Sequence, residues 1–431
     1  MNSQVKQRGL YPLVISHYLA SAIFFVILSL MLFLSTKELA GHYFHPRLLA
    51  ITHMAALGWG TLIIFGAAYQ LLPVVFETEL ASIKMPWISF VLFLAGLAQL
   101  VWSFWEFSPG RLMQSGGLLI LLAILLFAIT VFRTSQQSAA RGNIQQKFIV
   151  TSCLWLFLTA LLGVLLVFNF NYPFLPKDHL SFLKLHAHMG IGGWFLMLII
   201  GVSAKLIPMF LVSTRQNERL LRQSYYLCNA ALLLFLTDTY FWGINPKTAV
   251  IALLLLAGLL CYAGYIVTCF RSRLKKQIEL PIANTILSFV LMGLAVVVLP
   301  FVIHYHLKGD PRSIHYTTLY GSLLFMGWIS ALILGQTFKT LPFIVWVQKY
   351  EHLAGKQKTP LPADLYKQWL LQLQTGFFLS FCFLFFVGCL FKLEVLMGAG
   401  IACLILTSLA YTINLAAILL HRSKTIHHER L

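Results

Sequence analysis

Two histidines occupy the same place in a repeated pattern and could each donate a ring nitrogen to a metal ion. The pattern has members at offsets 0, +5, +6, +13 and +20, and its copies start 135 and 134 residues apart. An imidazole inside an apolar helix needs a buried partner, so the repeated histidine indicates a ligand. The three copies are His53, Gly58, Trp59, Gly66 and Pro73; His188, Gly193, Trp194, Gly201 and Pro208; and Ser322, Gly327, Trp328, Gly335 and Pro342.

Two further histidines are candidate ligands. His186 precedes His188 by two residues, so on a regular helix the two rings point about 200° apart, and at most one of them faces a given site. His315 lies seven residues before Ser322. Two helical turns separate them on one face, so His315 could supply the ligand that the third copy lacks.

The helical face around each repeated histidine is apolar. Such a wall, with one histidine near its end, suits a flat macrocycle whose iron is bound by imidazole, that is, a heme. The alternative is that these faces meet lipid or a neighbouring helix. The positions at +4, +7, +11, +14 and +18 are Leu57, Gly60, Ile64, Ala67 and Leu71 in the first copy, and Gly192, Phe195, Ile199, Val202 and Leu206 in the second.

The composition is that of a polytopic membrane protein. Hydrophobic residues make up 59% of the chain and charged residues 10%, which leaves no polar surface for a soluble globule. Every backbone group needs an internal partner in lipid, so the apolar runs predict an all-α fold. Twelve spans are predicted, at 11–36, 47–76, 85–107, 111–133, 147–170, 180–213, 222–243, 247–271, 280–306, 313–347, 366–391 and 394–421.

The spans form one predicted membrane domain, residues 1–431, with three groups of four helices at about 11–133, 147–271 and 280–421. Basic residues in short loops stay on the cytoplasmic side. With both termini cytoplasmic, the inner loops and tails hold 20 Lys and Arg residues and the outer loops 9. The formal charge of +18 therefore reflects topology, and no nucleic-acid-binding motif accompanies it. Residues 11–36 lack a cleavage site and are expected to stay as a helix.

Other polar residues have simpler interpretations. Nine of the fourteen histidines fall at the outer side, and several of these need be no more than interfacial residues. Lys205 and Lys339 lie near the inner boundary, where a lysine reaches water. Asp238 and Tyr240 lie near the histidines and could bond a ligand or cap a helix. The seven cysteines all lie in apolar helices and are expected to be packing residues.

Twelve helices in three groups, with histidines at the outer ends of helices two and six, resemble subunit I of the heme-copper oxidase superfamily. The resemblance covers nearly the whole chain. It implies that His53, in the segment HMAALGWGTLIIFG, binds a low-spin heme. It implies that His186 or His188, in LHAHMGIGGW, takes the place of a copper ligand on the sixth helix.

The chain departs from the superfamily at copper. The resemblance requires a His-x-His pair on helix ten, where this chain has Tyr320 and Ser322, and two adjacent histidines on helix seven. No histidine occurs between His188 and His304. Copper and four-electron oxygen reduction are therefore not expected. The segment LHAHMGIGGW also resembles the NnrS family, heme proteins linked to the nitric oxide stress response.

These patterns predict a multi-pass protein of the bacterial cytoplasmic membrane that binds heme, of b type, through His53 and His188. Its expected role is respiratory electron transfer or nitric oxide chemistry. Its expected partners are nitric oxide or oxygen and an electron-donating cytochrome or quinol. Two alternatives stay open: a secondary transporter, and a non-catalytic subunit of a respiratory complex. Repeats of four helices keep one membrane orientation, which differs from the inverted repeats of many transporters.

Overall fold

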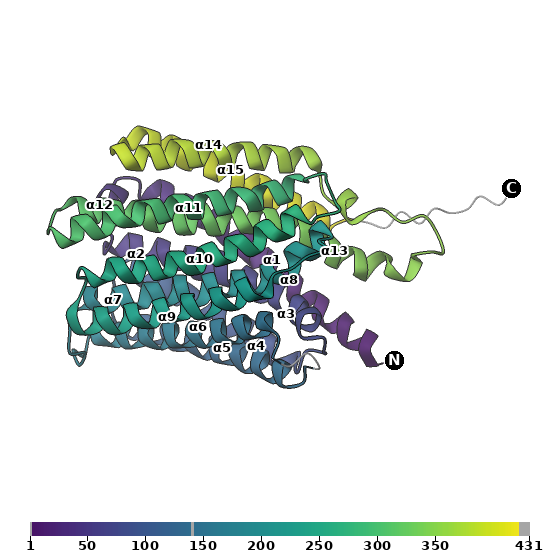
Figure 1. The fold of residues 1–431 in the computed structure, drawn as a ribbon, viewed down its shortest axis with the longest axis horizontal. Coiled ribbons are helices and arrows are strands. Elements are labelled where there is room, and N and C mark those ends of the chain that lie inside the picture. Colours follow the sequence, from purple (N-terminus) through teal and green to yellow (C-terminus); the bar gives the residue numbers. More distant parts are fainter. Residues whose placement is uncertain (1, 139–141, 422–431) are drawn as a thin grey trace.

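The computed structural model describes residues 2–138 and 142–421, and in these ranges the chain is a bundle of long helices without strands (Figure 1). Nine spans are single helices: α1 (Asn2–Leu34), α4 (Lys84–Trp105), α5 (Arg111–Gln136), α6 (Ile144–Asn169), α9 (Glu218–Trp242), α10 (Lys247–Arg271), α11 (Leu280–Leu307), α14 (Gln368–Phe391) and α15 (Glu394–Leu419). Short 3₁₀ segments, Glu38–Ala40, Glu351–Leu353 and Pro362–Leu365, lie outside the spans.

The remaining three spans carry the repeated pattern and are each built from three consecutive segments. The second span joins α2 (Pro46–His53), η2 (Met54–Thr61) and α3 (Leu62–Phe76). The sixth joins α7 (His179–His188), η3 (Met189–Leu196) and α8 (Met197–Leu211). The tenth joins α12 (Arg312–Ser322), η4 (Leu323–Ile329) and α13 (Ser330–Tyr350). The prediction of twelve helical spans is thereby confirmed for the described residues.

Eleven of these spans are long and apolar enough to cross a membrane. The twelfth, α9, has 25 residues but is less apolar, because charged residues in its first turns are followed by further polar ones, among them Asn229 and Asp238. Both ends of the described chain lie at the same end of the bundle (Figure 1), as an even number of crossings requires. The chain is therefore a multi-pass membrane protein.

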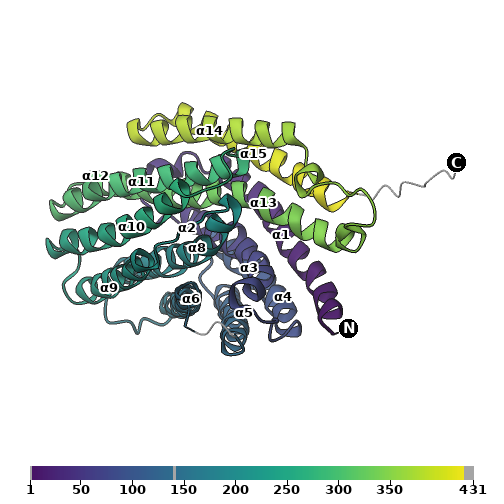
Figure 2. The same ribbon diagram turned by 45° about the vertical axis from the view of Figure 1, so that its right-hand side comes forward.

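The spans that carry the pattern form the centre of the bundle. In their most apolar windows 72%, 78% and 67% of the residues are buried, against at most 50% in each other candidate span. In two views α14 and α15 lie on one side of the bundle and α4, α5 and α6 on the opposite side (Figure 2). The segments α2, α7 and α12 lie toward one end and α3, α8 and α13 toward the other, so the three copies run in the same direction (Figure 1).

Each copy contains a π-helical segment that begins directly after the first residue of the pattern. These segments, η2, η3 and η4, start at Met54, Met189 and Leu323. A π-helix closes its hydrogen bonds over five residues instead of four, and it is common at functional sites. The segment therefore changes which later residues share a face with the histidine.

This change corrects the expected apolar wall. Leu57 lines the same cavity as His53, as predicted. Ile64, Ala67 and Leu71 do not; they line a central cavity of about 140 Å³ together with their equivalents Ile199, Val202 and Leu206. The predicted face is therefore divided between two cavities and does not form one continuous wall.

The lysines within the sixth and tenth spans pair with carboxylates near the end of the bundle that holds the termini. Lys205 lies 3.8 Å from Glu77, which follows α3. Lys339 is hydrogen-bonded to Glu279, the residue before α11. These charged partners agree with the prediction that Lys205 and Lys339 lie near a membrane boundary.

The cysteines are free, as expected. All seven are unpaired thiols, and five are buried.

Candidate functional site

His53 ends α2 and presents one ring nitrogen that is free to bind a ligand. Its Nδ1 lies 2.7 Å from the carbonyl oxygen of Leu49, one turn earlier. A carbonyl oxygen only accepts hydrogen bonds, so Nδ1 carries the proton and Nε2 keeps its lone pair. The ring of Phe104, on α4, stacks on the imidazole at a centroid distance of 4.8 Å. Both contacts fix the orientation of the ring.

His186, on α7, is held in the same way by a different helix. Its Nδ1 lies 3.0 Å from the carbonyl oxygen of Thr159 on α6, which again leaves Nε2 with its lone pair. Gly163, one turn further along α6, makes room for the ring. A Cβ atom at this glycine would lie 2.9 Å from Cε1 of His186.

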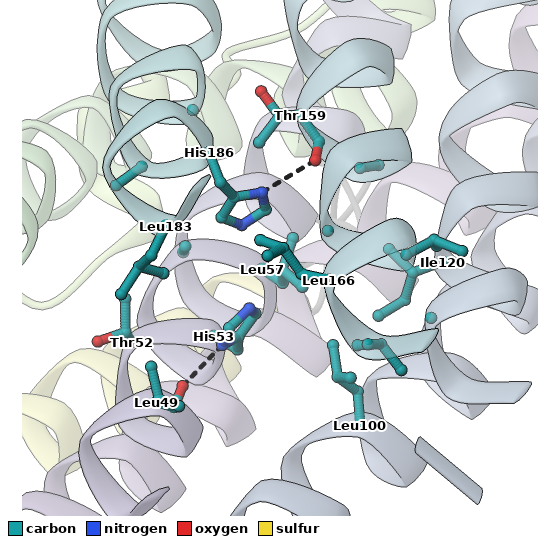
Figure 3. Close-up of a pocket in the computed structure, with 18 of the residues that line it drawn as sticks. Leu49, Thr52, His53, Leu57, Leu100, Ile120, Thr159, Leu166, Leu183 and His186 are labelled. Atoms are coloured by element: carbon teal, nitrogen blue, oxygen red, sulfur yellow. Dashed lines mark hydrogen bonds between the residues drawn. The ribbon is translucent and has the colours of Figure 1, made fainter. Parts of the chain in front are cut away.

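The two imidazoles face each other. Their centroids are 6.3 Å apart and their planes are inclined by 30°. In Figure 3 the ring nitrogens that make no hydrogen bond to the backbone point toward one another, and the Leu49 and Thr159 carbonyls lie on the outer sides. The second and sixth spans thus present two opposed lone pairs.

This arrangement has the dimensions of a metal ion bound by one imidazole on each side. Metal–nitrogen bonds to histidine are about 2 Å long and the ring centre lies roughly 1 Å behind its nitrogen, so two such rings have centroids roughly 6 Å apart. Backbone carbonyls that orient the distal ring nitrogen are the usual supports of a metal-binding histidine. The two imidazoles leave the remaining positions of such a metal open to the ligand atoms of a cofactor.

The surrounding cavity is apolar and has a volume of about 180 Å³. No acidic residue, lysine or arginine lines it. Small residues widen it, among them Gly117, Gly163 and Gly190. At the mouth His179 stacks on Phe170 at 4.4 Å, and its Nε2 lies 3.2 Å from the Leu166 carbonyl. An apolar chamber with two opposed imidazoles suits a flat iron macrocycle better than a bare ion.

The other predicted ligands lie elsewhere. His188 lines a second, larger cavity, with its Nδ1 2.8 Å from the Lys184 carbonyl and its ring 4.3 Å from that of Phe235. His186 and His188 therefore face different sites, which confirms that at most one of them faces any given site. His315 lies against α14, with its Nε2 3.3 Å from the Leu390 carbonyl. The structure does not bring His315 to His53 or to His188.

Asp238 and Tyr240 do not support a histidine. Asp238 accepts a hydrogen bond of 2.6 Å from Asn245 and lies 4.0 Å from Lys247, so it fastens the turn between α9 and α10. The carbonyl and the ring of Tyr240 contact Lys177. The sequence allowed Asp238 either to bond a ligand or to cap a helix, and its observed contacts are those of a cap.

Within the described ranges no three or more His, Cys, Asp or Glu side chains gather in an arrangement that could hold a metal ion. The sequence prediction missed three contributors: the carbonyls of Leu49 and Thr159 and the stacked ring of Phe104. Since any residue supplies a carbonyl, only the folded structure could reveal the first two.

Comparisons with known proteins bear on the fold. No family model matches the chain. An uncharacterized protein from Aquifex aeolicus (strain VF5) is 27% identical over 298 residues, which cover 68% of this chain and 71% of that protein. A heme-copper terminal oxidase, solved as a dimer by cryo-electron microscopy, superposes with a TM-score of 0.67. The match covers 97% of this chain and 84% of the oxidase chain, at 11% identity.

The chain has the fold of a heme-copper terminal oxidase. The resemblance of the sequence to subunit I of the heme-copper oxidase superfamily implies heme ligands on helices two and ten. Here the ring that faces His53 comes from the sixth span, and the tenth span has Tyr320 and Ser322 at the corresponding places. The histidine of the second span therefore faces a histidine of the sixth span, whereas the resemblance implies a partner on the tenth.

Proposed function

We propose that this protein binds one b-type heme between His53 and His186 and carries electrons within a bacterial cytoplasmic membrane. The observation that carries the proposal is the pair of opposed imidazoles, 6.3 Å apart between centroids, inside an apolar chamber. When bound, the heme supplies a one-electron couple between ferric and ferrous iron. His188 as an iron ligand stays a prediction from the sequence.

The residues of the chain determine what such a cofactor can do. His53 and His186 would hold the iron from opposite sides, and a heme held by two imidazoles would favour electron transfer over the binding of oxygen or nitric oxide. The Leu49 and Thr159 carbonyls hold the imidazoles in orientation, and Phe104 packs on the His53 ring. The apolar lining would keep water from a bound heme and so influence its reduction potential. An electron-donating cytochrome or a quinol is the expected partner.

Heme content of purified variants tests this proposal. We expect the pyridine hemochrome assay to find about one heme per chain in the wild-type protein and a large loss in both His53→Ala and His186→Ala. His188→Ala is the matched control, because the residue lies two positions from His186 and lines the other cavity. Full heme content in both test variants would refute the assignment.

The spectrum separates the remaining roles. Six-coordinate, low-spin iron supports an electron carrier, whereas five-coordinate iron that binds nitric oxide would favour gas chemistry. Colourless protein that drives substrate uptake in liposomes would favour the transporter.

A further inference from the structure

A ring of hydrogen bonds between the three central spans is broken at one position. Trp59 donates from its Nε1 to the Ser330 hydroxyl at 3.1 Å, and Trp194 donates to the Thr61 hydroxyl at 3.1 Å. In both cases the tryptophan at offset +6 of one copy bonds the hydroxyl at offset +8 of another. The three copies are thus joined by two of the three bonds that would close a cycle.

The third bond of the cycle is missing because its acceptor is replaced. The +8 position that should accept from Trp328 is Leu196, which has no hydroxyl. The Trp328 side chain is 1% exposed, and its Nε1 has no hydrogen-bond partner among the described residues. A buried donor without an acceptor is costly, so an unpaired group of this kind indicates a missing partner.

Trp328 and Leu196 both line a cavity of about 270 Å³, larger than the one between His53 and His186. Trp328 lies six residues beyond Ser322 along the tenth span, and therefore deeper in the bundle than the first pattern residue. Nearer the outer end, His188 keeps a free lone pair on Nε2, since its Nδ1 bonds the Lys184 carbonyl. The Tyr320 hydroxyl, also in the lining, has no partner among the described residues. The cavity thus has hydrogen-bonding groups at two depths and apolar walls between them.

The cavity lies where two copies of the repeat separate. At the corresponding boundaries α5 packs along α6 and α15 packs along α1, whereas α10 and α11 touch over a short stretch only. The two helices instead face each other across the cavity, with Ile251, Leu255 and Leu259 on α10 and Met292, Val296 and Leu299 on α11. Their opposite faces are exposed and apolar. A molecule dissolved in lipid would reach the cavity between α10 and α11.

We propose that this cavity binds a membrane quinone or quinol. The molecule has a flat ring that suits apolar walls, and it has oxygen atoms at opposite edges. One oxygen accepts the Trp328 Nε1–H, and the other accepts a hydrogen bond from the Tyr320 hydroxyl. In the quinol, the second oxygen carries a proton and can instead donate to His188 Nε2. A fatty acid would leave Trp328 unpaired, because its carboxylate would stay with Lys184 and its chain has no acceptor. Quinone binding does not depend on the heme. For the electron carrier proposed above, the quinol is the electron donor.

The test is calorimetric titration of the purified full chain with a decyl-tailed benzoquinone. Leu196→Thr gives Trp328 a hydroxyl acceptor within the protein. Leu196→Val is its control, because valine has the shape of threonine without the hydroxyl. We expect Leu196→Thr to weaken binding about fivefold, the equivalent of one hydrogen bond, and Leu196→Val to bind like the wild type. Trp328→Phe should weaken binding similarly, while Trp59→Phe, which lies outside the cavity, should not.

Equal affinities of the Thr and Val variants, or no binding to the wild type, would overturn the proposal. Loss of heme in His188→Ala would also overturn it, since that result would place a porphyrin in this cavity. His53→Ala should bind the quinone normally. The quinone proposal and the heme proposal therefore fail by different results.

Discussion

The imidazole rings of His53 and His186 lie opposite each other, 6.3 Å apart between centroids, although they come from different copies of the repeat. Each ring is anchored by its Nδ1 to a backbone carbonyl, and each directs Nε2 toward the other. The site is therefore formed by the packing of α2, α6 and α7, and neither the second nor the sixth span forms it alone.

The first prediction concerns the space behind His186. Gly163→Ala places a Cβ atom 2.9 Å from the Cε1 atom of His186, which is too close, so the ring has to shift from its position opposite His53. We expect lower heme content and a shift from low-spin toward high-spin iron in the optical spectrum. Gly192→Ala is the control, since Gly192 lines the other cavity and its Cβ would meet only Leu232, at an ordinary 3.6 Å. Identical spectra for the two variants would contradict the positioning role of Gly163.

The second prediction concerns the hydrogen bond between Trp194 and Thr61. Thr61→Val keeps the shape of the side chain but leaves the buried Trp194 Nε1 without its acceptor. Hydrogen bonds between membrane helices contribute about 1 kcal/mol, so we expect a lower melting temperature in detergent. Leu196→Thr should act in the opposite direction, because it gives Trp328 an acceptor. Stabilisation by Thr61→Val would count against the ring of bonds.

The third prediction concerns pH. Burial alone would raise the pKa of Glu279, but hydrogen bonds from Lys275 and Lys339 outweigh it, and the pKa is lowered. A lowered pKa in the folded state means that this carboxylate stabilises the fold above the pKa of the unfolded chain, about 4.3 for glutamate. That stabilisation disappears as the pH falls through the lower folded value.

Thermal unfolding as a function of pH measures this effect. Glu279→Gln should have a lower melting temperature than the wild type at pH 7, and the difference should narrow below pH 4. Glu106→Gln is the control, since Glu106 is exposed and forms no ion pair in the described chain. A difference that stays constant down to pH 3 would show that ionisation of Glu279 does not contribute.

Much of the fold was predictable because the bilayer imposes it. Runs of apolar residues long enough to span gave the helices to within a few residues, and the spacing of the pattern gave three parallel copies. The faces of these helices were less predictable. The periodicity of the sequence does not reveal the π-helical segments after His53 and His188, and Ile64 and Ile199 line a different cavity from either histidine.

The candidate site was predictable in part. The sequence identified His53 and the His186/His188 pair, but periodicity cannot tell which ring of the pair turns toward another span. The broken ring of hydrogen bonds between the central spans has a counterpart in the sequence. Offset +8 of the pattern is Thr61 in the first copy and Ser330 in the third, but Leu196 in the second. The missing hydroxyl can be read from the sequence, but only the structure shows that it leaves Trp328 without an acceptor in the described chain.

Electron paramagnetic resonance of the oxidised, purified protein tests the opposed imidazoles most directly. We predict the signal of low-spin ferric heme with two histidine ligands, lost or converted to high spin in both His53→Ala and His186→Ala and kept in His188→Ala. An unchanged low-spin signal in His186→Ala, or its loss in His188→Ala alone, would contradict the account.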